Sequence, residues 1–133
     1  MTTTVSAPVR TTSARALTIG LWTLQAALAA LFAGGGLAKL GGSPEMVDMF
    51  ADIGAGQWFR YLVGGLELAG AIGLLIPRLA GLAALGLAAL MVGATVTNVF
   101  VLDANPALPL GLMLVAGVVA WARRAQVAAF YTR

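Results

Sequence analysis

Apolar residues along this chain fall into long runs that are separated by short polar segments. The runs cover residues 17–40, 58–76, 79–102 and 107–122. A helix rises about 1.5 Å per residue, so about 20 apolar residues cross the hydrocarbon layer of a bilayer. The pattern therefore predicts an all-α, integral membrane four-helix bundle. A cleaved signal peptide is the rival interpretation of the first run, although that run exceeds the roughly 7–15 apolar residues of such peptides.

The polar ends of the chain are predicted to lie outside the membrane. Residues 1–15 are rich in Thr and Ser and are expected to form a disordered cytoplasmic tail. Residues 125–133 follow the last apolar run and are expected to form a second cytoplasmic tail. A single transmembrane domain then covers residues 16–124.

The longest connection, residues 41–58, has the features of a short helix. Ser43 is placed as an N-cap, with Pro44 at the first helical position and Glu45 in the first turn. Apolar residues follow at helical spacing, and Gly54 and Gly56 end the pattern. We predict a short amphipathic helix between the first and second spans, lying at the membrane surface. A packing loop is the alternative.

Composition supports a bilayer as the main solvent of the chain. Apolar residues make up 60% of the sequence and charged residues 10%, with a mean hydropathy of +0.93. Soluble domains are usually about half apolar and about a quarter charged. The net charge is +3, but no basic patch is interleaved with aromatic residues, so nucleic acid is not expected as a partner.

The basic residues predict an orientation in the membrane. Lys39 and Arg60 fall on one side of the predicted spans, together with Glu45, Asp48 and Asp52. The other arginines fall on the opposite side: Arg10, Arg15, Arg78, Arg123, Arg124 and Arg133. Because basic residues are retained on the cytoplasmic side, both termini are predicted to be cytoplasmic.

Small residues form stripes along three of the predicted spans. In the second span they recur every fourth position, at Gly65, Ala69 and Gly73. Similar stripes are Gly34 and Ala38 in the first span, and Ala80, Ala84 and Ala88 in the third. Such stripes let helix backbones approach closely in lipid. They predict packing within the bundle, with a homodimer as the alternative use of one stripe.

Polar residues gather in the half of the predicted bundle that lies away from the cytoplasm. Glu67 lies within the second span, where an unpaired carboxylate is costly. Because side chains lean toward the N-terminus of their own helix, Lys39 and Glu67 lean toward each other and are expected to pair. Arg60 is a second candidate partner, and Thr95 and Asn98 lie at a similar depth. The cluster is interpreted either as a structural ion pair or as a ligand or proton site.

The residue types that are missing limit the chemistry. The sequence contains no Cys and no His, so disulfides, thiolate nucleophiles and imidazole ligands for haem, copper or zinc cannot form. No catalytic residue and no metal site is predicted, and no cofactor motif is evident. A quinone could still lie in an apolar bundle beside one lysine and one carboxylate.

Several segments, taken in order, resemble the DoxX-like family of small bacterial membrane proteins. They are Gly34-Gly35-Gly36-Leu37-Ala38-Lys39-Leu40, Phe59-Arg60-Tyr61, Gly65-Leu66-Glu67-Leu68-Ala69-Gly70, Leu74-Leu75-Ile76-Pro77-Arg78 and Met91-Val92-Gly93-Ala94. The resemblance covers roughly residues 17–124. It implies a four-helix membrane bundle in the bacterial plasma membrane, with Lys39 and Glu67 at the positions of the typical lysine and glutamate. Many relatives carry a histidine late in the third span, where this chain has Asn98.

The resemblance and the buried polar residues together lead to three hypotheses about function, of which the first rests on the resemblance and the second on Glu67 and the polar cluster around it. The first is a non-catalytic accessory or scaffold subunit of a membrane-associated redox or oxidative-stress complex, which would have a membrane redox protein as its partner. The second is a small transporter or ligand-binding membrane protein that uses the buried Glu67. The third is a quinone-linked oxidoreductase subunit, which the missing Cys and His disfavour.

Overall fold

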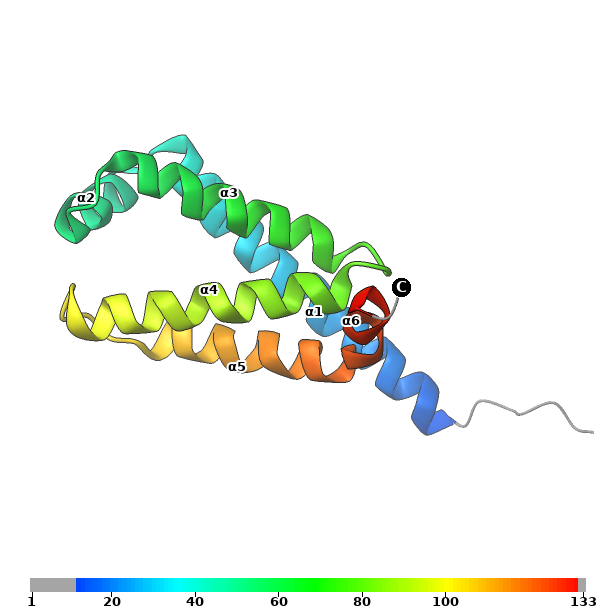
Figure 1. Cartoon of the computed structure of the whole chain (residues 1–133). Helices are drawn as coiled ribbons and strands as arrows, with labels where there is room; N and C mark the ends of the chain where they lie inside the picture. The colour runs from blue at the N-terminus through cyan, green and yellow to red at the C-terminus, as the bar shows by residue number, and fades with distance from the viewer. Residues whose placement is uncertain (1–11, 132–133) are drawn as a thin grey trace, which may run out of the picture.

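The computed structural model describes residues 12–131, and within them the ordered elements are all helices (Figure 1). The helices are α1 (Thr12–Gly41), α2 (Pro44–Ile53), α3 (Gln57–Leu74), α4 (Ala80–Phe100), α5 (Ala107–Ala122) and α6 (Arg124–Tyr131). The all-α part of the predicted fold class is therefore confirmed.

The long helices form two side-by-side pairs, α1 with α3 and α4 with α5. The α3–α4 connection joins the pairs at one end, and α3 and α4 diverge from it toward the other end, where α2 lies (Figure 1). We call these the arginine end, which carries Arg78, Arg123 and Arg124, and the α2 end.

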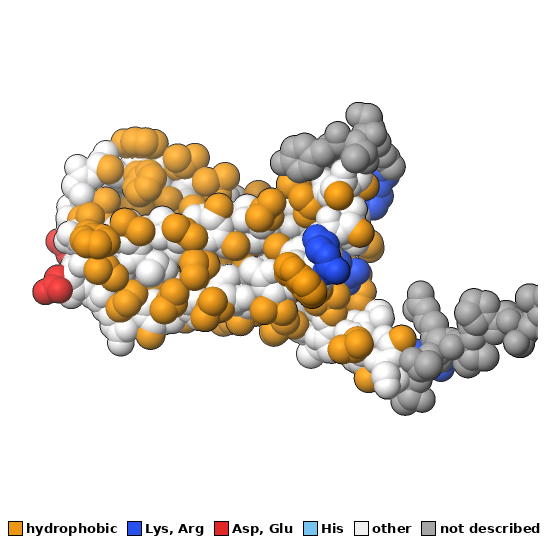
Figure 2. Space-filling view, turned by 60° about the horizontal axis from the view of Figure 1, so that its bottom comes forward, with side chains coloured by type: hydrophobic (Ala, Val, Ile, Leu, Met, Phe, Trp, Pro, Cys, Tyr) orange, Lys and Arg blue, Asp and Glu red, His pale blue; other side chains and the backbone are white. Residues whose placement is uncertain are grey.

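A core of apolar side chains joins the two pairs. Its largest members include Leu28 and Phe32 from α1, Leu74 from α3 and Leu87 from α4. Many other apolar side chains are exposed, among them Phe100 at 79%. Figure 2 shows hydrophobic side chains over the length of the visible face, with Lys and Arg toward one end and Asp and Glu toward the other.

Two helical segments are long and apolar enough to cross a membrane, Ser13–Gly41 and Ala80–Phe100. A third helix, α5, is apolar but has 16 residues. The spanning of a membrane by all four long helices stays a prediction at this point.

The helix boundaries differ from the predicted ones at both ends of the chain. Residues 12–15 form the first turn of α1 rather than part of a tail, while residues 1–11 lie outside the described residues. Residues 125–131, within the predicted second cytoplasmic tail, are helical and belong to α6, while residues 132–133 lie outside the described residues. Alanines favour the helix there, and Gln126 accepts a hydrogen bond from the Gly81 backbone N–H, at 3.3 Å.

The short helix between the first two long helices is present as α2. It begins at Pro44 after Ser43 and ends at Gly54, whose φ of 83° is the left-handed conformation that favours glycine. Phe50 is buried, and its ring lies 5.8 Å from the ring of Phe59. The apolar face of α2 therefore packs at least in part on α3, and the position of α2 at the membrane surface stays a prediction.

The small-residue stripes are used only in part as predicted. The closest approach of α1 and α3 is at Gly36 and Gly64: a Cβ on Gly36 would lie 2.8 Å from the Gly64 carbonyl oxygen. Gly34 and Gly65, which belonged to the predicted stripes, have open space where a Cβ would be. Adjacent glycines in the sequence leave the face of contact ambiguous, so Gly34 and Gly65 were the wrong choices for the contact between α1 and α3. Other stripe members do pack within the bundle as predicted: Ala80 and Ala84 are fully buried, and a Cβ on Gly73 would lie 2.8 Å from Ala83 Cβ.

A buried polar group at the arginine end was missed by the sequence analysis. Gln25 is fully buried and donates a hydrogen bond to the Leu74 carbonyl at 2.9 Å. Its side-chain oxygen accepts two hydrogen bonds from Arg123, at 3.0 and 2.9 Å. Gln25 thereby bonds the last turn of α3 and the end of α5 to α1, and it satisfies a carbonyl that a helix end leaves unpaired.

Replacing Gln25 with leucine should lower the free energy of unfolding by roughly 1–3 kcal/mol, because the Leu74 carbonyl and the Arg123 guanidinium lose their partner. Equilibrium unfolding in bicelles, followed by helicity, measures the change. Thr23→Ala is the matched control, since the exposed Thr23 hydroxyl bonds only within its own helix, to the Ile19 carbonyl. Equal stability of the Gln25→Leu variant and the wild type would show that this network contributes nothing.

Candidate functional site

An ion pair joins α1 to α3 toward the α2 end. Lys39 Nζ lies 2.9 Å from Glu67 Oε1, and the two side chains are only 14% and 6% exposed. The expected contact between these residues is therefore present. Because α1 and α3 run in opposite directions (Figure 1), the two side chains lean toward each other, as side chains lean toward the N-terminus of their helix.

The glycine run of α1 makes room for the carboxylate. A Cβ on Gly35 would lie 2.7 Å from Glu67 Oε2, closer than carbon and oxygen atoms can approach. Gly35 therefore faces the carboxylate, while the adjacent Gly36 faces the α3 backbone. Within this run, Gly36 thus serves the helix contact and Gly35 the ion pair.

Arg60 does not pair with Glu67, contrary to its place as a second candidate partner. It is 5% exposed, and its Nε donates to Gln57 Oε1 at 2.7 Å. Its Nη1 donates to the Lys39 carbonyl, in the last turn of α1. Arg60 leans toward the start of α3 and therefore away from Glu67, which lies further along the same helix.

A cavity of about 390 Å³ lies between the two helix pairs beneath α2. Lys39 and Glu67 line it on one side, and Thr97 and Asn98 line it on the other. The remaining lining is mostly apolar, and α2 contributes Met46, Met49 and Phe50. The sequence predicted a polar cluster that includes Lys39, Glu67 and Asn98, but not the apolar wall that α2 supplies.

The other predicted site residues are divided between the cavity and its surroundings. Asn98 lines the cavity, and its amide nitrogen donates to the Asn105 carbonyl at 3.1 Å. Thr95 is absent from the lining, and its hydroxyl donates to the Met91 carbonyl at 2.7 Å, within its own helix. Of the five predicted residues, the cavity therefore brings together Lys39, Glu67 and Asn98, but neither Arg60 nor Thr95.

The cavity offers hydrogen bonding without net charge. An ammonium group has three N–H donors and a carboxylate has several acceptor positions, so the ion pair can both donate to and accept from a third group. Among residues 12–131, no group of three or more His, Cys, Asp or Glu side chains could hold a metal ion. The chemistry that these residues support is the recognition of a small molecule with a hydrogen-bonding group.

Comparison with known proteins identifies the family of the chain. Residues 23–129 match the DoxX-like family, which covers all four long helices apart from the first turns of α1. Searches of curated proteins and of solved structures returned no match. The chain belongs to the DoxX-like family.

Proposed function

We propose that this DoxX-like protein is an integral membrane protein that binds a small, mostly apolar molecule in the cavity beneath α2. The observation that carries the proposal is the Lys39–Glu67 ion pair in the wall of that cavity. If the ion pair served only to hold the helices together, we would expect packed side chains to surround it on all sides. Here it borders about 390 Å³ of space.

Location in a membrane is supported by where apolar and charged side chains lie. Large apolar side chains are exposed along the flanks of the long helices, including Leu31 at 60% and Leu114 at 60%. Exposed apolar surface of this extent is typical of a surface that contacts a membrane or a partner protein. Charged side chains gather at the two ends instead (Figure 2).

The orientation follows from the same separation of charge. Arg78, Arg123 and Arg124 lie at the arginine end, whereas the α2 end carries the exposed acids of α2 and Asp103. By the positive-inside rule, this separation supports an orientation in which the arginine end and both termini are cytoplasmic. The cavity accordingly lies in the half of the protein away from the cytoplasm, in the bacterial plasma membrane.

The ion pair favours a ligand whose polar group is uncharged. Lys39 and Glu67 neutralise each other, so an anionic or cationic ligand would leave one unpaired charge in a poorly solvated site, which is costly. A hydroxyl or carbonyl oxygen can instead accept a hydrogen bond from the ammonium, and a hydroxyl can also donate one to the carboxylate. The methionines from α2 suit an apolar ligand of variable shape, because their side chains are flexible.

The proposal can be tested with 4-ethylphenol, an uncharged probe with one hydroxyl. Gly93 lines the cavity and has open space at its Cβ position, so Gly93→Cys places a single thiol for a polarity-sensitive dye. We expect 4-ethylphenol to change the dye emission with saturation, and Glu67→Gln to weaken binding about tenfold, the value of a hydrogen bond to a charged group. 4-Ethylbenzoate, which carries a charge, should bind more weakly.

A dye at Gly111→Cys is the matched control, because Gly111 also has open space at its Cβ position but lies outside the cavity lining. An equal response at both positions, or equal affinity in the Glu67→Gln variant, would contradict the proposal.

An accessory or scaffold role in a redox or oxidative-stress complex remains compatible with ligand binding. It is supported by the family and by the lack of Cys and His in the chain, and a quinone is one uncharged molecule that the cavity chemistry would accept. Purification from native membranes in polymer-bounded discs tests this role. A stable redox partner in the discs supports it, and a protein that is always isolated alone contradicts it.

A further inference from the structure

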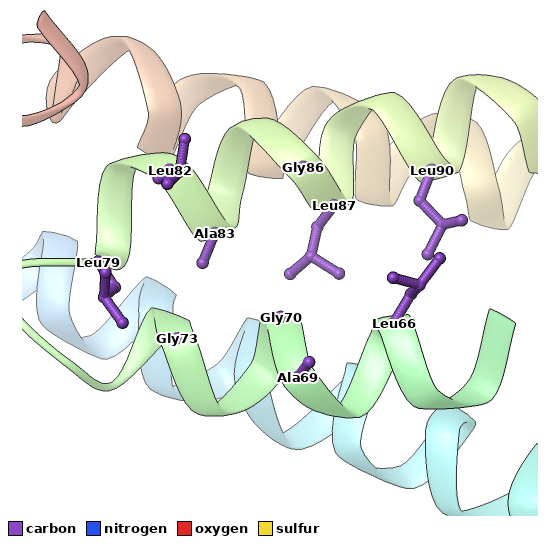
Figure 3. Close-up of a pocket in the computed structure, with 10 residues that line it drawn as sticks. All are labelled: Leu66, Ala69, Gly70, Gly73, Leu79, Leu82, Ala83, Gly86, Leu87 and Leu90. Carbon is purple, nitrogen blue, oxygen red and sulfur yellow. The ribbon is translucent and has the colours of Figure 1, made fainter. Parts of the chain in front are cut away.

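A second, wholly apolar space lies beside the cavity, between α3 and α4. It is a groove of about 690 Å³. Figure 3 shows its lining. Residues of α3 between Leu66 and Gly73 face residues of α4 up to Leu90, together with Leu79, which directly precedes α4. No polar side chain contributes to the lining, so the groove suits hydrocarbon and offers nothing to a polar group.

The groove and the cavity are adjacent. Leu90 lines both spaces, and on α3 the adjacent residues Leu66 and Glu67 line the groove and the cavity respectively. In Figure 3 the side chains of Leu66 and Leu90 approach each other across the gap between the helices. These two leucines therefore form the boundary between the apolar groove and the cavity that contains the ion pair.

The length of the groove matches one hydrocarbon chain. From Leu79 to Leu90 the chain advances 11 residues, which is about 16 Å at the rise of a helix. This is about half of the ~30 Å hydrocarbon layer, the depth that one lipid chain occupies. The groove also opens on the flank of the protein, since Leu66 is 50% and Leu82 40% exposed.

From these observations we propose that the ligand is a membrane amphiphile with an uncharged head and one hydrocarbon chain. The head lies in the cavity and hydrogen-bonds to the Lys39–Glu67 pair, and the chain passes Leu66 and Leu90 to lie in the α3–α4 groove. The amphiphile enters sideways from the bilayer through the open flank of the groove, where Leu66 and Leu82 are exposed. This inference rests on the proposed function and adds the class of ligand and its route.

Glycines in the groove provide a selective way to block it. Gly70 and Gly73 are closely packed: a Cβ would lie 2.5 Å from Leu87 Cδ2 and 2.8 Å from Ala83 Cβ respectively. Gly86 lines the groove but has nothing within 4 Å of its Cβ position. A Gly86→Leu side chain therefore fills groove space without displacing the backbone, and leucine favours the helix more than glycine does.

The experiment uses two uncharged probes in the same bilayer nanodiscs, 4-ethylphenol and 4-dodecylphenol, with the dye at Gly93→Cys. Gly86→Leu should weaken the binding of 4-dodecylphenol about tenfold, because the leucine side chain occupies space that the dodecyl chain needs. The affinity for 4-ethylphenol should be unchanged. Gly111→Leu is the matched control, because Gly111 has equally open surroundings and lines neither space. Comparing variants in one bilayer cancels the partitioning of the probe into lipid.

A diazirine at the end of the dodecyl chain locates the chain directly. We expect the probe to crosslink to residues in the range 79–87 of the protein. The yield of crosslinks should be reduced by Gly86→Leu, by Glu67→Gln and by excess dodecanol. Crosslinks that persist in Glu67→Gln, or that form equally with a dodecanoate probe, would show a groove filled by any lipid chain and would overturn the inference. Equal effects of Gly86→Leu and Gly111→Leu on the binding of 4-dodecylphenol would also overturn the inference.

The two proposals fail in different ways. If 4-ethylphenol binds and depends on Glu67, but the dodecyl chain does not label the groove, the cavity keeps its function and the inference about the chain is wrong. If neither phenol binds the wild type, the proposed function itself is wrong. If Gly86→Leu does not fold, as judged by helicity, Gly86→Ala gives a smaller obstruction with the same expected direction.

Discussion

Replacing Lys39 with methionine should lower the free energy of unfolding by roughly 3–5 kcal/mol, because it leaves the Glu67 carboxylate buried without its partner. The side chain of Glu67 is only 6% exposed, so solvent cannot take the place of the ammonium. Replacing Lys39 with methionine and Glu67 with leucine together should cost much less, since the double variant buries no charge. Equilibrium unfolding in bicelles, measured for both single variants and the double variant, separates the ion pair from the packing of each side chain.

An exposed ion pair would behave differently. Pairs on a surface contribute about 1 kcal/mol or less, so a loss of that size in the Lys39→Met variant would mean that the pair is well solvated. Arg78→Met is a suitable control, because it removes an exposed positive charge at the other end of the molecule.

Replacing Gly36 with leucine should separate α1 from α3 and lower the free energy of unfolding by about 3 kcal/mol or more. A Cβ at this position would lie 2.8 Å from the Gly64 carbonyl oxygen and 3.0 Å from the Leu68 backbone nitrogen. Backbone atoms cannot rotate aside as a side chain can, so the helices themselves must move. The same movement would stretch the Lys39–Glu67 contact, which lies one turn away.

Gly34→Leu is the matched control for this variant. Gly34 lies two residues away in the same helix, and its Cβ position has nothing within 4 Å. Its replacement should change the free energy of unfolding by no more than about 0.5 kcal/mol, as for other surface positions. Similar losses for Gly34→Leu and Gly36→Leu would contradict the assigned contact between α1 and α3.

The sequence predicted the helices and the ion pair because both depend on local signals. The apolar runs determine where the long helices form, and opposite helix directions make Lys39 and Glu67 lean together. The faces used for packing depend instead on the partner helix. Periodicity alone could not choose between Gly34 and Gly36, or between Gly64 and Gly65, because both members of each pair are glycine.

Gln25 and α2, at the two ends of the molecule, also make contacts that the sequence pattern alone could not predict. Gln25 interrupts the apolar run of residues 17–40, and it could have been noticed as the only amide there. Its partners, the Leu74 carbonyl and Arg123, are distant in sequence. For α2 the spacing of Met46, Met49 and Phe50 predicted an apolar face, but whether that face meets lipid or protein depends on tertiary packing.

The pairing of α1 with α3 also sets an order for synthesis. The α4–α5 pair consists of neighbouring segments and can form as soon as its second helix is made, whereas α1 must wait for a partner beyond α2. Lys39 leaves the ribosome 28 residues (67 − 39) before Glu67, which is about one to six seconds at the usual rate of elongation. During that interval the ammonium has no carboxylate, so the nascent chain needs water, a lipid phosphate or the insertion machinery beside Lys39 until α3 arrives.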